Sequence, residues 1–536
     1  MKSINLEVNK QEVGSEQKHP HLKKILIAVC IALMAVIASV SGLNVAQPML
    51  ALEFNASQNT VLWMINIYTL TLAALLLPLG AIGDRQGRKK MLLIGLTLFG
   101  LASVLSGVAT SSTMMLIARF LTGIGAAMIM PVTLAVITST FPTEERSKAI
   151  GIWTGVAGGG GILGMYLSAL LVDVATWRWL FILPVVLSTI SIMMTIRFIP
   201  NSTEKAAHKF DIFGSILSVM ATVGIIFALH ELPSFGLREP FVLISLIMGI
   251  VGVVGFIFWE LRQQAPLIDI RLFRERSLSS GSITLLTVFG VQAGIFIVLF
   301  PFFQGVLGWS GLLSTLAMMP MAVLMMVSSG LAPKFAPRIG NKNTMALGIG
   351  LGALGAMLMA GFVSVELGYL SILPGLIVMG AGMGFSMTSS TEAITSSLPD
   401  GRQGVASALN DITRELGTAL GIALLGPLVT AGYSSAIAEK LNDFSEQVVT
   451  KAKEGLAHAQ LIAPSTGNQQ ELLVSIARES FVTGWQQAMW VGAGVMVLLF
   501  VYILIRGTQS KHSIKENNYT DKLTQSIENN PLKIDK

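Results

Sequence analysis

Runs of about 20 apolar residues recur along almost the whole chain, and this feature constrains its fold more than any other. A helix of that length crosses the hydrocarbon core of a bilayer. In lipid, only helices or closed barrels satisfy every backbone polar group, and barrel strands alternate apolar with polar residues. The composition agrees, because 12% of the residues are charged and the mean hydropathy is +0.69. The sequence therefore predicts an all-α polytopic membrane protein.

The apolar runs predict fourteen membrane spans. They lie at 24–48, 59–82, 91–110, 113–139, 148–172, 179–199, 212–230, 240–260, 278–306, 311–333, 344–364, 370–396, 405–431 and 483–506. Cytoplasmic loops of membrane proteins carry an excess of lysine and arginine. If both termini are cytoplasmic, most of the 36 basic residues fall on the inner side. Those left outside are Arg178, Arg238, Lys440, Lys451, Lys453 and Arg478. The bias predicts this orientation, since a missed span would invert every later loop.

A faint internal repeat predicts two related halves. The sequence "DRQGRKK" (84–90) follows the second span and "PRIGNKN" (337–343) follows the tenth. Two related halves around a central site are common in secondary transporters. The predicted organisation has five parts: a cytoplasmic N-tail at 1–23, a six-helix bundle at 24–199, two inserted linker helices at 212–260, a second six-helix bundle at 278–506 that includes an outer helical hairpin at 432–482, and a disordered cytoplasmic tail at 507–536. No small-residue cleavage site follows the N-tail, so the first span is interpreted as retained. A tethered loop without a role is the alternative for 432–482.

The loop "GAIGDRQGRKK" (80–90) is unusually charged for this chain. A carboxylate such as Asp84 beside the lipid boundary is costly unless it is paired or caps a helix. Gly80 lets a second helix approach closely, and Gly87 permits a tight turn. The hypothesis is a conformational latch between helices that must separate, formed by Gly80, Asp84, Arg85, Gly87 and Arg88. Lys89 and Lys90 are interpreted as membrane-surface anchors instead.

Two carboxylates inside the thirteenth span predict a proton-coupling site. Asp411 and Glu415 lie four residues apart and therefore on one helix face. Burial and mutual repulsion both disfavour the charged form of a carboxyl group, so such a pair can load and release a proton. The alternative is a fixed structural pair neutralised by Arg414. Glu392, near the inner end of the twelfth span, is a further proton-coupling candidate, or else lies at the level of the lipid headgroups.

Aromatic side chains and carboxylates around an apolar cavity are suited to binding organic cations. The candidate substrate-binding residues are Trp63, Tyr68, Phe289, Gln292, Phe296, Asp411 and Glu415. Packing against lipid is the alternative for the aromatic residues.

Other chemistries lack their sequence signatures. Cys30 is the only cysteine, which excludes an intrachain disulfide and a cysteine-based metal cluster. The chain contains no phosphate-binding Gly-x-x-x-x-Gly-Lys-Ser/Thr loop and no histidine-rich constellation for a metal. No basic patch is interleaved with base-stacking aromatics, so nucleic acid is not an expected partner. We expect neither an enzyme nor a cofactor.

Several motifs resemble the major facilitator superfamily. "GAIGDRQGRKK" is similar to its Gly-x-x-x-Asp-Arg-x-Gly-Arg-Lys signature, and "LIARFLTGIGAA" (116–127) resembles its span-four motif. Further stretches resemble the branch of fourteen-span drug:proton antiporters: "FPTEERSKAIGIWTG" (141–155), "WRWLF" (177–181), "APLIDIRLFRER" (265–276) and "SALNDITRELGTALGIALLG" (407–426). The last of these and the long final outer loop are most similar to bacterial exporters of quaternary ammonium compounds.

The resemblance implies a major facilitator fold with 14 transmembrane helices, arranged as six, two and six. It implies a proton-relay role for Arg119, for which a structural clamp is the alternative. It also implies a helix-bending motif in the fifth span at Gly158, Gly160, Gly161 and Gly164. Three positions depart from the branch: Ser39 stands where an aspartate usually precedes "NVA", Gly161 stands at the usual proline of the span-five motif, and Met165 stands at its last glycine.

The function expected from these observations is proton-coupled multidrug efflux by alternating access, which confers antimicrobial resistance. The expected cargo is lipophilic and cationic, such as quaternary ammonium biocides and dyes, and the driving force is the proton gradient. A monomer in the bacterial cytoplasmic (inner) membrane is expected. Two alternatives stay open: a proton-coupled transporter of a specific metabolite on the same fold, and a membrane receptor that does not transport.

Overall fold

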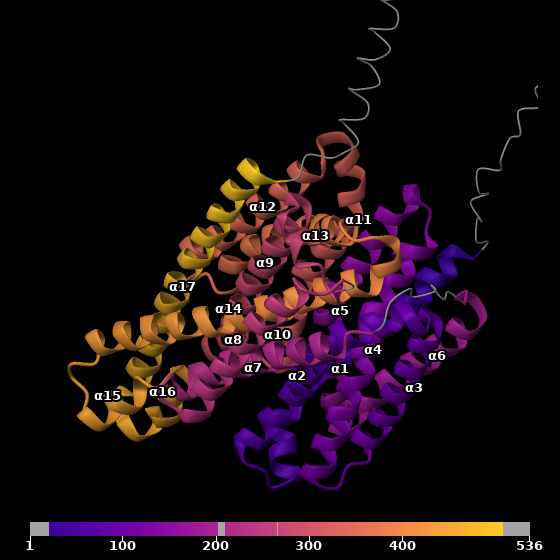
Figure 1. Cartoon of the computed structure of the whole chain (residues 1–536). Helices are drawn as coiled ribbons and strands as arrows, with labels where there is room; N and C mark the ends of the chain where they lie inside the picture. Colours follow the sequence, from indigo (N-terminus) through magenta and orange to yellow (C-terminus); the bar gives the residue numbers. More distant parts are fainter. Residues whose placement is uncertain (1–20, 202–209, 265, 508–536) are drawn as a thin grey trace, which may run out of the picture.

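The computed structural model describes residues 21–201, 210–264 and 266–507 as a bundle of long helices (Figure 1). Among these residues, fourteen helical segments are long and apolar enough to cross a membrane, which confirms the predicted number of spans. The predicted N-tail and C-terminal tail lie almost wholly outside the described residues.

The first six spans are formed by α1 to α6. Their bounds are α1 (Leu22–Glu53), α2 (Gln58–Gln86), α3 (Arg88–Gly107), α4 (Ser112–Thr140), α5 (Thr143–Val174) and α6 (Ile182–Phe198), with a short helix η1 (Trp177–Phe181) before α6. These helices gather on one side of the bundle in Figure 1. Within this group α2 packs on α4, α3 on α4 and α6, and α1 on α5.

The next two spans are the helices α7 (Ile212–Phe235) and α8 (Pro240–Glu260). The helices that follow this pair are α9 (Arg276–Pro301), α10 (Gly311–Ala317), α11 (Met319–Ile339), α12 (Asn341–Phe362), α13 (Tyr369–Thr395), α14 (Gln403–Lys440), α15 (Glu446–Ala452), α16 (Leu456–Ile462) and α17 (Gln470–Arg506). Four short segments complete this part: η2 (Ile270–Arg274), η3 (Phe302–Val306), η4 (Asp400–Arg402) and η5 (Ala463–Gln469). The division of these helices into bundles of six, two and six stays a prediction.

The helices meet across two long contacts that join α1–α6 to α9–α17. On one side α2 packs on α14, and on the other α5 packs on α11. Glycines permit the first contact, because a Cβ atom at Gly80 would lie 2.6 Å from the carbonyl oxygen of Gly404. A similar approach occurs in the second, where a Cβ atom at Gly151 would lie 2.6 Å from the carbonyl oxygen of Ser329. Small residues therefore set the distance between the two groups of helices.

The pair α7 and α8 lies on the outside of the α2–α14 contact. Close backbone approach at Gly224 and Gly249 joins α7 to α8. In turn α7 packs on both α2 and α14, where Ile226 contacts Ala73 and Ala419 in a small buried cluster. Much of α8 faces away from the protein, as expected of a helix in lipid.

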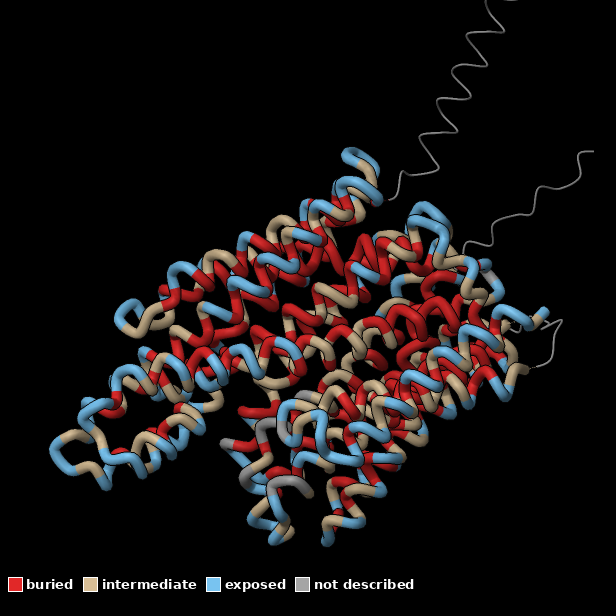
Figure 2. Tube along the Cα trace, turned by 60° about the vertical axis from the view of Figure 1, so that its left-hand side comes forward, coloured by how far each residue is buried: buried red, intermediate tan, exposed pale blue. Residues whose placement is uncertain are grey.

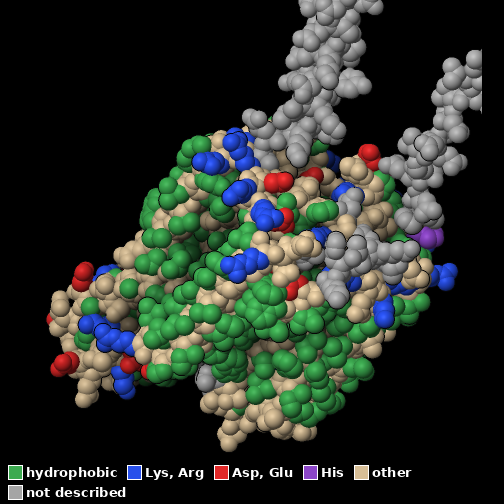
Figure 3. Space-filling model, viewed as in Figure 1, with side chains coloured by type: hydrophobic (Ala, Val, Ile, Leu, Met, Phe, Trp, Pro, Cys, Tyr) green, Lys and Arg blue, Asp and Glu red, His purple; other side chains and the backbone are tan. Residues whose placement is uncertain are grey.

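The surface matches a bilayer. Figure 3 shows a broad hydrophobic face, with basic and acidic side chains gathered along its upper edge and around α15 and α16 at the lower left. Figure 2 shows that buried residues concentrate where helices face one another, while the outer faces are exposed. The apolar exterior is the face that lipid would cover.

The segment 432–482 is helical for most of its length, so it is not a bare tether. Helix α14 continues to Lys440, nine residues beyond the predicted end of the thirteenth span, and α17 begins at Gln470, well before the predicted start at 483. The predicted Pro/Gly turn is present in η5, where Gly467 has a φ of +58°. The segment also contacts the helices below, because the Gln460 side chain donates to the carbonyl oxygen of Gly305 at 2.6 Å. Its assignment to the second bundle stays a prediction.

Candidate functional site

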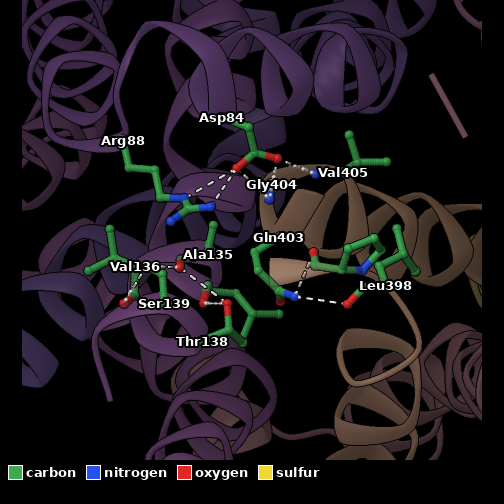
Figure 4. Close-up of polar contacts among 12 residues, drawn as sticks. Asp84, Arg88, Ala135, Val136, Thr138, Ser139, Leu398, Gln403, Gly404 and Val405 are labelled. Carbon is green, nitrogen blue, oxygen red and sulfur yellow. Dashed lines mark hydrogen bonds and ion pairs between the residues drawn. The ribbon is translucent and has the colours of Figure 1, made fainter. Parts of the chain in front are cut away.

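Asp84 binds the start of a helix that lies 320 positions later in the sequence. Its two carboxylate oxygens accept hydrogen bonds from the backbone N–H of Gly404 at 2.9 and 2.8 Å, and one accepts from Val405 at 3.2 Å (Figure 4). These are N–H groups of the first turn of α14, which have no partner within their own helix. The positive end of the helix dipole also attracts the carboxylate.

Arg88, at the start of α3, also binds Asp84 and completes this cluster. Its guanidinium donates to one Asp84 oxygen through Nε at 3.2 Å and through a terminal nitrogen at 3.0 Å. Both side chains are buried, at 7% exposure for Asp84 and 3% for Arg88. Gly87, at a φ of +103°, makes the turn between α2 and α3 that brings Arg88 back over Asp84. Arg85 is placed differently, since its guanidinium lies 5.5 Å from the Phe210 ring.

Glu392 makes a second contact between α1–α6 and α9–α17. The hydroxyl of Ser147, on α5, donates to a carboxylate oxygen of Glu392, on α13. Glu392 is partly buried, and the alternative of a residue at the level of the lipid headgroups stays open. Its predicted role in proton coupling remains a prediction. The sequence offered no signal for Ser147 as its partner.

Arg119 is fully buried on α4 and its partners are polar but uncharged. It donates from one terminal nitrogen to the Ser39 hydroxyl at 2.9 Å and from Nε to the Met64 carbonyl oxygen at 3.2 Å. Its guanidinium lies 4.3 Å from the centre of the Tyr68 ring. Its other terminal nitrogen, NH2, has no hydrogen-bond partner among the described residues. Ser39, one of the positions at which the sequence departs from the resembled pattern, thus supplies a hydroxyl oxygen that accepts from Arg119.

We expect Ser39→Ala to lower the free energy of unfolding by about 1–3 kcal/mol, because a buried guanidinium donor loses its acceptor. Thermal unfolding in detergent measures this change. Ser103→Ala is the matched control, since Ser103 is equally buried but donates to the Phe99 carbonyl within its own helix. Ser39→Asp should raise the stability above that of the wild type by pairing with Arg119. An equal loss in Ser39→Ala and Ser103→Ala would contradict this account.

Asp411 is buried on α14, and its two carboxylate oxygens differ in their hydrogen-bond partners. Oδ1 accepts from the Asn410 amide at 3.2 Å and lies 3.5 Å from a guanidinium nitrogen of Arg414. Oδ2 has no hydrogen-bond partner among the described residues. The contact with Arg414 is thus single and long, unlike the bidentate pairs that hold a carboxylate firmly. The free oxygen is a position where a proton can bind.

Glu415 lies one turn further along α14 and is partly buried. It interacts electrostatically with Asp411 and Arg414 on its own helix. It also interacts electrostatically with Tyr68 on α2. Tyr68 itself donates to the Val36 carbonyl oxygen at 3.1 Å. Helix α2, which carries Tyr68, packs on α14, which carries the carboxylate pair.

The aromatic candidates separate into two sets. The Phe289 ring lies 4.6 Å from the Arg414 guanidinium, which brings it to the carboxylate pair. Gln292, one turn beyond Phe289 on α9, has a buried side-chain oxygen without a hydrogen-bond partner among the described residues. Phe296 is partly buried on the same helix. Trp63, on α2, has its ring 5.4 Å from that of Phe227 on α7.

The glycines of the fifth span permit close helix packing. A Cβ atom at Gly158 would strike the Met325 side chain of α11. On the other side of α5, a Cβ atom at Gly160 would lie 3.1 Å from Met34 and one at Gly164 would lie 3.2 Å from Ala38, both on α1. Helix α5 is continuous through this stretch, which also contains Gly161. The predicted bending role of these four glycines stays a prediction.

Comparison with known proteins gives one consistent result. The family model of the Major Facilitator Superfamily matches residues 29–422. The chain is 27% identical to the multidrug resistance protein Stp of Mycobacterium tuberculosis, over 89% of this chain and 90% of that protein. It is 28% identical to the methyl viologen resistance protein SmvA of Salmonella typhimurium, over 89% and 96%. It is 30% identical to the multidrug efflux pump LfrA of Mycolicibacterium smegmatis, over 86% and 90%.

A solved structure agrees in fold. The human organic anion transporter MFSD10 superposes with a TM-score of 0.61 at 13% identity, covering 90% of this chain and 100% of that one. A likeness at this identity concerns the arrangement of the helices alone.

Proposed function

This chain belongs to the major facilitator superfamily, and on that premise we propose that it exports lipophilic cationic drugs in exchange for protons. It is a multi-pass membrane transporter and not an enzyme, and multidrug efflux is the activity of the relatives that match most of its length. The proposal adds three points: the charge of the cargo, the coupling to protons, and a bacterial inner-membrane location with both termini in the cytoplasm.

The observation that carries the proposal is the surroundings of Asp411. A buried carboxyl group with one free oxygen can gain and lose a proton without unfolding its surroundings. Glu415, Tyr68 and Phe289 border the same region of the protein. A carboxylate and aromatic faces are the groups that bind an organic cation in an apolar setting. Proton and cargo therefore compete for one cluster, which is the basis of exchange.

The proposed cycle uses the Asp84 cluster as the latch. With the hydrogen bonds to Gly404 and Val405 in place, α2 and α14 are held together at that end of the bundle. Opening at this end breaks those bonds and admits cargo to the ionised carboxylates. Protons entering from the other side then displace the cargo after the halves rock. Moving one charge through 100 mV contributes about 2.3 kcal/mol to this work.

Efflux of ethidium from a pump-deficient bacterial host tests the proposal. We expect cells that express the chain to extrude ethidium, and an uncoupler to abolish the extrusion. Uptake of the dye into inside-out vesicles on acidification of the lumen gives the direction of exchange. The absence of efflux of every cationic dye tried, from protein shown to be in the membrane, would remove the export hypothesis. Import of cargo together with protons would favour a symporter of a specific metabolite.

A further inference from the structure

A cavity of about 570 Å³ opens between α1, α5 and α6, apart from the Asp411 cluster. Its walls come mainly from one face of α1 and the facing side of α5, with Leu187 contributed by α6. These walls are almost entirely apolar. The cavity plays no part in the exchange cycle proposed above and is not occupied by any described side chain of the protein.

The cavity has one polar end and one apolar end. Lys23, Glu145 and Lys148 border it at the beginnings of α1 and α5, and all three are exposed. Met34 and Val156 border it further along the same two helices. The rise of 1.5 Å per residue places Lys23 and Met34 roughly 16 Å apart along α1. This length is close to half of a bilayer core of about 30 Å, that is, one leaflet.

The charge at the polar end selects among possible occupants. Two lysines face one glutamate there, so the mouth carries a net positive charge. An anionic headgroup is attracted by this arrangement, with each basic residue near such a surface contributing about 1 kcal/mol. A lipophilic cation is repelled by the same two lysines. The apolar walls behind them fit an acyl chain.

We propose that this cavity, which forms a groove between α1 and α5, binds one anionic phospholipid. The headgroup phosphate lies between Lys23 and Lys148, and an acyl chain runs along α1 towards Met34. A lipid held there contacts α1 and α5 together, the two helices that also pack through Gly160 and Gly164. The proposal does not depend on the identity of the cargo or on coupling to protons.

Native mass spectrometry of the full chain in detergent tests the headgroup preference. Delipidated protein is titrated with phosphatidylglycerol or phosphatidylcholine that carry the same acyl chains. We expect one phosphatidylglycerol to bind about tenfold more tightly than phosphatidylcholine. The double variant Lys23→Gln with Lys148→Gln should lose this preference.

A matched control removes two lysines that do not border the groove. Lys24 follows Lys23 on α1 but lies over the Phe198 ring at 4.9 Å, and Lys334 is exposed on α11. The double variant Lys24→Gln with Lys334→Gln makes the same change in charge and should keep the preference. If both double variants lose the preference for phosphatidylglycerol equally, the proposed site is wrong. The preference would then reflect a general attraction of anionic lipid to a basic protein.

Cys30 provides an independent reporter of occupancy, because it borders the groove and is the only cysteine in the chain. We expect phosphatidylglycerol to slow its alkylation by N-ethylmaleimide, measured by intact mass, and phosphatidylcholine to slow it much less. The double variant Lys23→Gln with Lys148→Gln should not show this protection. Protection by ethidium but not by phosphatidylglycerol would overturn the proposal in favour of a route for cargo. Alkylation that is indifferent to both lipids would also overturn it.

Discussion

Replacing Asp411 by asparagine should reduce gradient-driven dye efflux to the level of the host without the protein. Asparagine keeps the size of the side chain and the hydrogen bond to Asn410, but it cannot bind and release a proton. Exchange of labelled for unlabelled dye without a proton gradient should persist at a higher dye concentration, because Glu415 and the aromatic residues still bind cargo and this reaction needs no net proton movement. Transport assays in vesicles, with and without an imposed pH gradient, separate the two activities.

The control for this variant is Asp443→Asn, which removes a carboxylate exposed between α14 and α15 and should leave both activities unchanged. Asp411→Glu retains a titratable group and should restore part of the coupled efflux. Unchanged gradient-driven efflux in Asp411→Asn would reject the assigned role. Loss of both activities would show instead that Asp411 is needed for cargo binding.

Replacing Asp84 by alanine should open the end of the bundle at which α2 meets α14. The change removes the acceptor of the Gly404 and Val405 N–H groups and leaves the Arg88 guanidinium without its carboxylate. Removing one partner of a buried ion pair costs about 3–5 kcal/mol. We therefore expect a lower melting temperature together with a population shift towards the state that is open at this end.

A cysteine at position 408, in a Cys30→Ser background, reports this opening. Ala408 is fully buried, and its Cβ lies 3.1 Å from the position of a Cβ atom at Gly80. Alkylation of Ala408→Cys should become at least about tenfold faster in Asp84→Ala, as expected when charge-assisted hydrogen bonds of roughly 1.5–3 kcal/mol are lost.

Gly80→Ala gives a second route to the same state without changing any charge. The added methyl group would lie 2.6 Å from the Gly404 carbonyl oxygen and must push the two helices apart. Gly330→Ala is the matched control, because a Cβ atom there meets nothing within 4 Å. If neither Asp84→Ala nor Gly80→Ala changes the alkylation of Ala408→Cys, the contact between α2 and α14 is not the latch.

The sequence predicted the number of spans because hydropathy records which residues must avoid water. The ends of the predicted spans differ from the ends of the helices. Hydropathy marks the edge of the lipid core, whereas a helix can continue beyond it, as α14 does to Lys440 and α17 does from Gln470. The composition of segment 432–482 could indicate helices there, but not that they extend the neighbouring spans.

The partners of the functional residues were much harder to predict. The cost of a lone carboxylate indicated that Asp84 needs a partner, but nothing local identifies the N–H groups of Gly404 and Val405. Arg119 presents the same difficulty, since the sequence marks its acceptor Ser39 only as a departure from a family pattern. Spacing along one helix did predict that Asp411 and Glu415 share a face. Contacts between distant helices depend on tertiary packing, which periodicity does not encode.

The position of α7 limits how far the two groups of helices can separate. Helix α7 packs against both α2 and α14, and its Ile226 forms a buried cluster with Ala73 of α2 and Ala419 of α14. If α2 and α14 separate, α7 must lose its contacts with one of them or move relative to both. Leucines of all three helices pack around this contact: Leu70 on α2, Leu229 on α7 and Leu416 on α14. We therefore expect the pair α7 and α8 to restrict how far α2 and α14 separate during transport, in addition to filling space in the bilayer.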